Sequence, residues 1–162
     1  MKKTKQKCHI CDHVTKTPAD QTPASYCENC EADLLNPSQE TKKLYTVVTK
    51  EAGGVRGDLV KVYLTDQRLM FISDGVSSSF VGGGLIGAVV ESAVDAIRKP
   101  KQIETYASVL RSEINAVKDE VAGRLKNKTA LTVSTKDGET YTMTLSKKEG
   151  AQFKTELSRS LT

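Results

Sequence analysis

Hydrophobic and polar residues alternate in several short stretches after residue 40, which predicts β-strands that each bury one face. Two pairs of these stretches form hairpins, because a polar turn at residues 65–68 separates the first pair and Asp137-Gly138 separates the second. A further strand is expected over residues 115–124, although that stretch also admits a helical turn. The expected strands cover residues 44–49, 59–64, 69–72, 115–124, 131–135 and 141–145.

The end of the chain predicts an amphipathic helix. Ser146 and Glu149 have the spacing of a capping box, in which the Ser hydroxyl accepts from a backbone amide and the Glu side chain reaches back. Phe153, Leu157 and Leu161 then recur every four residues and share one face. We expect this helix to cover one open end of a strongly bent antiparallel sheet.

A second, inserted helix is expected over residues 80–100, between the two hairpins. Its apolar residues share one helical face, charged residues lie opposite, and Pro100 ends it. Gly83 and Gly87 have the small-residue spacing that permits close contact with another helix. The apolar face either packs on its own domain or contacts a protein or a membrane, and we favour a protein partner, in particular a second copy. The predicted contact residues are Leu85, Ile86, Val89, Val90, Ala93, Val94 and Ile97.

All four cysteines lie in the first thirty residues, as two C-x-x-C pairs with fifteen residues between them. A C-x-x-C turn directs two sulfur atoms toward one ion, so two such pairs complete the four-thiolate site typical of structural zinc. A segment of this length with few apolar side chains forms no core alone, and the metal would supply folding energy. Residues 31–35 favour a helix, which fits a treble-clef finger better than a ribbon. The predicted ligands of one Zn²⁺ per chain are Cys8, Cys11, Cys27 and Cys30.

Other uses of these cysteines have less support. Two disulfides need an oxidising compartment, and the N-terminal lysines are followed by no apolar stretch of an export signal. A redox pair needs a thioredoxin-like βαβ context, which the sequence lacks. His9 or His13 would be an alternative ligand, but we expect both at the surface or beside the site. A catalytic zinc needs an open coordination position and a nearby general base, and no such motif occurs.

The 162 residues divide near residue 40 in composition and charge. Residues 8–40 hold six acids and one base, whereas the net charge of +4 depends largely on four lysines among the first seven residues. A broadly basic nucleic-acid-binding body is therefore not expected. No run of about 18 apolar residues occurs, so no membrane-spanning helix is expected. The expected regions are a disordered basic tail at 1–7, a zinc finger at 8–36, a linker at 37–42 and a second domain at 43–162.

The second domain resembles the GRAM and bacterial PH-like domains over roughly residues 41–160. The sequence YLTDQRLMF at residues 63–71 is similar to their hairpin, and SEINAV at 112–117 is similar to the segment that enters their middle strand. Asp137-Gly138 and the capped final helix fit the closing half. The resemblance implies an α+β protein, in which the finger precedes a PH-like antiparallel barrel that is capped by the C-terminal helix and carries the inserted helix. Such domains bind lipids, peptides or other proteins and are rarely enzymes.

Basic residues near two predicted turns are candidates for contact with an anionic ligand, although ordinary solvated loops have the same composition. In some PH domains the loop near the first of these groups holds phosphoinositide headgroups, but here acids interrupt the basic residues. The candidates are Lys50, Arg56, Lys61, Arg124, Lys126 and Lys128.

The sequence therefore predicts a non-enzymatic, cytoplasmic binding or adaptor protein with a structural zinc ion. We expect it to dock a protein partner or to self-associate through the inserted helix. The alternative is a peripheral membrane protein that binds lipid through the basic tail and the same helix. No catalytic set and no small-molecule substrate site are expected, since both histidines belong to the zinc region and no fifth cysteine is present. Nucleic acid is not an expected partner, because the finger is acidic.

Overall fold

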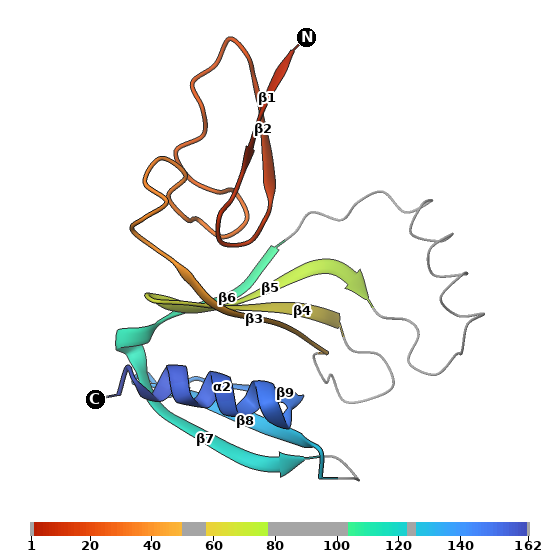
Figure 1. The fold of residues 1–162 in the computed structure, drawn as a ribbon, viewed down its shortest axis with the longest axis vertical. Helices are drawn as coiled ribbons and strands as arrows, with labels where there is room; N and C mark the ends of the chain where they lie inside the picture. Colours follow the sequence, from red (N-terminus) through yellow and green to blue (C-terminus); the bar gives the residue numbers. More distant parts are fainter. Residues whose placement is uncertain (1, 50–57, 78–103, 123–125, 162) are drawn as a thin grey trace, which may run out of the picture.

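The computed structural model describes residues 2–49, 58–77, 104–122 and 126–161. In these residues the chain forms antiparallel sheets and ends in a helix (Figure 1). The first two strands are β1 (Lys3–Lys7) and β2 (Val14–Pro18). The middle strands are β3 (Lys42–Thr49), β4 (Asp58–Thr65), β5 (Arg68–Ser77) and β6 (Glu104–Leu110). The short 3₁₀ turn η1 (Arg111–Glu113) leads to β7 (Ile114–Ala122), β8 (Lys128–Thr135), β9 (Thr140–Ser146) and helix α2 (Lys147–Ser158).

Within each sheet, the described strands pair in the order in which they follow along the chain. The sheets have the orders β1-β2, β3-β4-β5-β6 and β7-β8-β9, and all the pairs are antiparallel. Along the long axis of the molecule, the β1-β2 region lies at one end, the four-stranded sheet in the middle, and the three-stranded sheet with α2 at the other end (Figure 1). The N-terminal residues, expected to be a disordered tail, instead form β1.

The two predicted hairpins are confirmed, and local hydrogen bonds explain both turns. In the β4–β5 turn, the Thr65 hydroxyl accepts from the backbone N–H groups of Gln67 and Arg68 at 3.1 and 2.9 Å. In the β8–β9 turn, Gly138 adopts a φ of 93°, a conformation that side chains disfavour. Polar turn residues and a glycine therefore place the strand ends where the sequence pattern predicts them.

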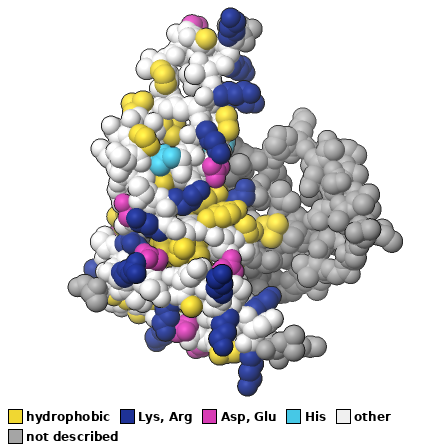
Figure 2. Space-filling model, viewed as in Figure 1, with side chains coloured by type: hydrophobic (Ala, Val, Ile, Leu, Met, Phe, Trp, Pro, Cys, Tyr) yellow, Lys and Arg dark blue, Asp and Glu magenta, His cyan; other side chains and the backbone are white. Residues whose placement is uncertain are grey.

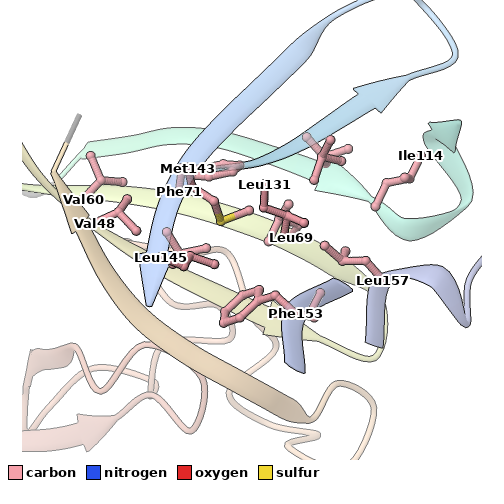
Figure 3. Close-up of a cluster of buried hydrophobic side chains, with 14 residues drawn as sticks. Val48, Val60, Leu69, Phe71, Ile114, Leu131, Met143, Leu145, Phe153 and Leu157 are labelled. Carbon is pink, nitrogen blue, oxygen red and sulfur yellow. The ribbon is translucent and has the colours of Figure 1, made fainter. Parts of the chain in front are cut away.

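The main core lies between the two larger sheets and helix α2 (Figure 3). Alternate residues of β4 and β5 supply one side, including Val62, Leu64 and Leu69. Residues of β8 and β9 and the helical residues Phe153 and Leu157 supply the other side. Each fully buried side chain of this size contributes about 1.5–3 kcal/mol to stability, so this cluster is the main source of stability of the C-terminal region.

The predicted C-terminal helix is confirmed together with its cap, but Leu161, expected on its apolar face, lies beyond its end and is 41% exposed. The Ser146 hydroxyl accepts from the Glu149 N–H, and the Glu149 carboxylate accepts from the Ser146 N–H at 3.3 Å. The same carboxylate accepts from the Thr46 hydroxyl of β3 at 2.9 Å. Hydrogen bonds from Ser146 first and Thr46 second lower the pKa of Glu149 below its ordinary value. This charged group therefore joins the start of α2 to the edge of the four-stranded sheet.

The predicted barrel is wrong. The β3–β6 and β7–β9 sheets are separate, and no strand pairing closes them into a barrel within the described ranges. The edges β3 and β9 lie in contact without a backbone ladder, and Thr46 of β3 donates to Glu149 of α2. The physical reason is that α2 leaves β9 directly at Ser146 and packs over β7, β8 and β9. The sheets are thus joined through side chains, mostly those of the apolar core, and not through backbone hydrogen bonds between strand edges.

The α+β prediction of a helix-capped barrel with an inserted helix is corrected accordingly. The structure has antiparallel sheets, and α2 is the one α-helix of the described part of the chain. The expected helix at 80–100, with all its predicted contact residues, lies outside the described residues. Among the residues that are described, no helix is long and apolar enough to cross a membrane.

Gly150 gives a test of the packing between α2 and β8. A Cβ added there would lie 2.9 Å from the Thr129 Cβ, closer than real Cβ atoms approach one another. Gly150→Ala is therefore expected to lower the free energy of unfolding by about 1–3 kcal/mol, although alanine favours helices. Chemical denaturation measures the change, and the exposed Gln152→Ala in the same helix is the control. A stabilised Gly150→Ala protein would contradict the close packing of α2 on β8.

Candidate metal centre

Two turns with the same hydrogen-bond pattern hold the four cysteines. In the first, which links β1 to β2, the Cys8 N–H donates to the His13 carbonyl and the Asp12 N–H donates to the Cys8 carbonyl. In the second, the Cys27 N–H donates to the Ala32 carbonyl and the Glu31 N–H donates to the Cys27 carbonyl. The two C-x-x-C segments therefore form equivalent knuckles.

Both knuckles turn at a residue with left-handed backbone. Asp12 and Glu31, each directly after the second cysteine of its pair, have a φ of 60°. That conformation brings the chain back across the two sulfur atoms of the knuckle and is costly for residues with a side chain. It persists only where the surrounding structure imposes it, so the knuckle geometry is tightly fixed.

The helix expected over residues 31–35 does not form. Glu31 has left-handed backbone, Asp33 forms an isolated β-bridge with Tyr26, and the Asp33 carboxylate accepts from the N–H groups of Leu35 and Asn36. These local bonds satisfy the amides that a helix would use. The finger thus consists of a β-hairpin and two knuckles, which is the ribbon arrangement and not the treble-clef arrangement that we favoured.

The four sulfur atoms lie within 4.8 Å of one another, and all four cysteines are buried. The Sγ atoms of Cys8 and Cys30 are 3.6 Å apart, and those of Cys11 and Cys27 are 3.5 Å apart. A disulfide needs about 2.05 Å. A tetrahedron of sulfur ligands around Zn²⁺ has edges of about 3.8 Å for Zn–S bonds near 2.3 Å. The distances therefore fit a shared metal ion and exclude the disulfide alternative in this structure.

Hydrogen bonds to sulfur complete the site. The Ile10 N–H donates to Cys8 Sγ, and the Asn29 side-chain amide donates to Cys11 Sγ, each at 3.4 Å. Such donors stabilise negative charge on sulfur and orient metal-binding thiolates. Asn29 is itself buried, and sequence reasoning had not assigned it a role.

Crowding couples the protonation of the four thiols. The neighbouring thiol of Cys11 is the main cause that lowers the pKa of Cys27, to about 6. Cys11 is also the main cause that lowers the pKa of Cys8 and the main cause that raises the pKa of Cys30. The pKa of Cys11 itself is raised, mainly by Cys27. Four buried sulfur atoms do not all carry negative charge at this distance unless a cation lies between them.

The two histidines are directed away from the sulfur cluster. The Nε2 atom of His9 contacts the Glu40 carbonyl at 3.0 Å, and the Nε2 atom of His13 contacts the Glu28 carboxylate at 2.8 Å. The four cysteines are the one group of three or more metal-ligating side chains found in the residues that the structure describes. A histidine therefore does not replace a cysteine in this arrangement.

The finger packs against the outer face of the four-stranded sheet. Ile10, between the first two cysteines, is fully buried and belongs to one cluster with the cysteines and with Tyr63, Met70 and Ile72 of the sheet. The Tyr63 hydroxyl donates to the Cys11 carbonyl at 3.3 Å. The sheet is thus buried on both faces, one by the main core and the other by the finger.

A buried ion pair supports this contact from the segment predicted as a linker. The Glu40 carboxylate accepts from two Arg68 nitrogens at 2.8 and 3.0 Å and from the Thr65 hydroxyl at 2.8 Å. Glu40 and Arg68 side chains are only 9% and 12% exposed, so removal of either partner would leave a buried charge without its counterion. The chain between finger and sheet is therefore held in one geometry.

The sequence contains a signal for this contact that was not used. Residues 62–64 and 69–72 are continuously apolar and do not alternate. Such a run is typical of a strand that is buried on both faces. Tyr63, Met70 and Ile72 could have been predicted as a second buried surface on that basis.

The remaining predicted site residues do not gather in one place. Lys61 lies on β4, opposite Val47 and Ile72, whereas Lys126 and Lys128 are exposed before and at the start of β8. Lys50, Arg56 and Arg124 lie outside the described residues. The structure therefore forms no common anion site from the members of this set that it describes.

Comparison with known proteins gives no relative for this chain: no family model, no curated protein and no solved structure matches it. The resemblance to GRAM and PH-like domains thus finds no support from these comparisons.

Ile10 tests whether the finger and the sheet form one unit. Ile10→Ala is expected to lower the free energy of unfolding by about 2–4 kcal/mol, because it leaves a cavity between the knuckles and the sheet. It should also speed amide hydrogen exchange at Tyr63 and Met70, whose face Ile10 covers. Val14→Ala, at a more exposed site in the same hairpin, is the control and should change little. Unchanged exchange in β4 and β5 would contradict the contact.

Proposed function

We propose that Cys8, Cys11, Cys27 and Cys30 bind one structural Zn²⁺ ion. The observation that carries this proposal is the buried group of four sulfur atoms within 4.8 Å of one another, held by two equivalent knuckles. Zinc is the divalent ion most typical of tetrahedral four-thiolate sites.

The role of this ion is structural in our proposal, and the protein is non-enzymatic. Four protein thiolates complete a tetrahedron and leave no coordination position for water or substrate. All four ligands are buried, three of them at about 1% exposure. Zn²⁺ would replace protons on the crowded sulfur atoms and fix the surface that covers Tyr63, Met70 and Ile72.

The protein then acts by binding a protein partner, a second copy included. The support comes from β3, which is an edge strand of the four-stranded sheet and exposes two large apolar side chains. Tyr45 is 47% exposed and Val47 is 45% exposed, on the same sheet face as Tyr63 but beyond the part that the finger covers. Exposed apolar and aromatic side chains that lie together are typical of surfaces that bind another protein. The contribution of residues 80–100 to this contact stays a prediction.

Metal analysis tests the zinc proposal. The purified protein should contain one zinc ion per chain, and Co²⁺ in its place should give the absorption of a tetrahedral four-thiolate site. Cys27→Ser should lose the ion at moderate chelator concentrations, because it removes one of four ligands. His13→Asn is the matched control and should retain the ion. Metal-free protein with an unchanged finger structure would contradict the proposal.

Light scattering over a concentration series tests self-association. We expect a mass of more than one chain at high concentration and a return to one chain in Val47→Asp, because a charge at this apolar position opposes its burial against another chain. Lys118→Asp, a charge change of at least the same size on the edge strand β7, is the control. A single-chain mass at every concentration contradicts a second copy as the partner.

A further inference from the structure

One face of the β1-β2 hairpin is formed mainly by lysines. In the register of this hairpin Lys5 lies directly opposite Lys16, Lys3 opposite Pro18, and Lys7 opposite Val14. Residues that lie opposite each other, and residues two apart on one strand, point to the same side. All four lysines are exposed, and Lys and Arg side chains gather along this end of the molecule in Figure 2.

The acids of the finger compensate only part of this charge, because Lys7 is the one lysine of the face that pairs with an acid in the described part of the chain. Asp12 pairs with Lys7 and Lys42, Glu28 contacts His13, and Glu40 is held by Arg68. Asp33 accepts from the N–H groups of its own turn. In the described part of the chain Lys3, Lys5 and Lys16 have no ion pair with an acid. The acidic composition of residues 8–40 therefore does not describe the surface of the hairpin.

The pairing of Lys5 with Lys16 is unfavourable by itself. Like charges directly opposite each other in an antiparallel pair destabilise it, since their Cβ atoms are only about 5 Å apart. An anion bound over the two ammonium groups would relieve this repulsion. The arrangement is thus a local conflict of the kind that proteins retain at binding surfaces.

We propose that this lysine face docks on an anionic lipid surface. The β1-β2 hairpin lies at one end of the long axis of the molecule, beside the N-terminus, and its strands run along that axis (Figure 1). Side chains on one face of a β-ribbon extend to a common plane, so the ammonium groups of Lys3, Lys5 and Lys16 reach a flat surface together. Lipid headgroups diffuse laterally and need no fixed spacing. Each lysine near such a surface strengthens binding roughly fivefold. This proposal does not depend on the proposed zinc ion or protein partner.

Nucleic acid and an acidic polypeptide fit the face less well. The face has no aromatic side chain on which bases would stack, and residues 1–40 contain no arginine for bidentate phosphate contacts. With an acidic peptide, each exposed ion pair must hold two long side chains in one geometry and gains less than a lysine gains near a membrane. These two ligands are therefore outcomes that the test must separate.

Vesicle sedimentation at 50 mM salt tests the proposal with the full-length protein. We expect binding to vesicles of 30% phosphatidylserine in phosphatidylcholine, none to pure phosphatidylcholine, and loss of binding at 500 mM salt because the charges are screened. The triple variant Lys3→Gln, Lys5→Gln, Lys16→Gln should bind about 100-fold more weakly. The matched control Lys118→Gln, Lys136→Gln, Lys147→Gln removes the same charge from exposed sites of the C-terminal region and should bind normally.

A composition-matched variant tests the face itself. Exchange of residues 3 and 4, as Lys3→Thr with Thr4→Lys, moves one ammonium group to the opposite side of β1 and should weaken binding roughly fivefold. Far-ultraviolet circular dichroism verifies that each variant keeps its fold. No binding of the wild-type protein to anionic vesicles, or an equal loss in the control triple variant, would overturn the proposal. Binding to a single-stranded oligonucleotide or to polyglutamate without binding to vesicles would overturn it as well.

Discussion

The N-terminal third of the chain depends on the close approach of four sulfur atoms. Apolar side chains are few in residues 8–36, and Ile10 is the large one that is fully buried there. Without a cation the four sulfurs compete for protons, whereas a shared metal ion makes their proximity favourable. The equivalent knuckles, the left-handed residues Asp12 and Glu31, and the N–H donors to sulfur all follow from this single requirement.

The same requirement extends into the four-stranded sheet. Ile10 lies between Cys8 and Cys11, so the sulfur cluster also positions the side chain that covers Met70 and Tyr63. The backbone amides of a sheet with two buried faces are shielded from solvent. The buried Glu40–Arg68 ion pair lies beside this contact and stabilises it. The finger is therefore part of the folding unit of β4 and β5 and not an appendage on a flexible linker.

Local features were predictable from the sequence, and contacts between distant segments were not. The spacing of the cysteines, the polar β4–β5 turn and the Ser146–Glu149 cap each depend on a few neighbouring residues, and the structure contains all of them. The ribbon form of the finger was missed because Asp33 directs its carboxylate to local amides, which helix propensity does not reveal. The barrel was wrong because closure depends on how two edges meet, and here α2 lies over β7, β8 and β9 while side chains of β3 reach the helix. The role of Glu40 depends on Arg68, which is 28 residues away.

The charge of a surface, like the contacts between distant segments, was not predictable from a count of residues in one segment. By count, residues 8–40 are acidic, yet four of their six carboxylates contact a basic residue, a histidine or backbone N–H groups of the same fold. What reaches solvent on the hairpin is the positive charge of alternate lysines, because a β-strand places every second residue on one face. The sign of a binding surface is thus set by which charges are paired within the fold. Three of the four lysines lie in residues 1–7, which hold no acid, and the hairpin brings them beside Lys16 of the acidic segment. A count over residues 8–40 therefore does not give the charge of this face.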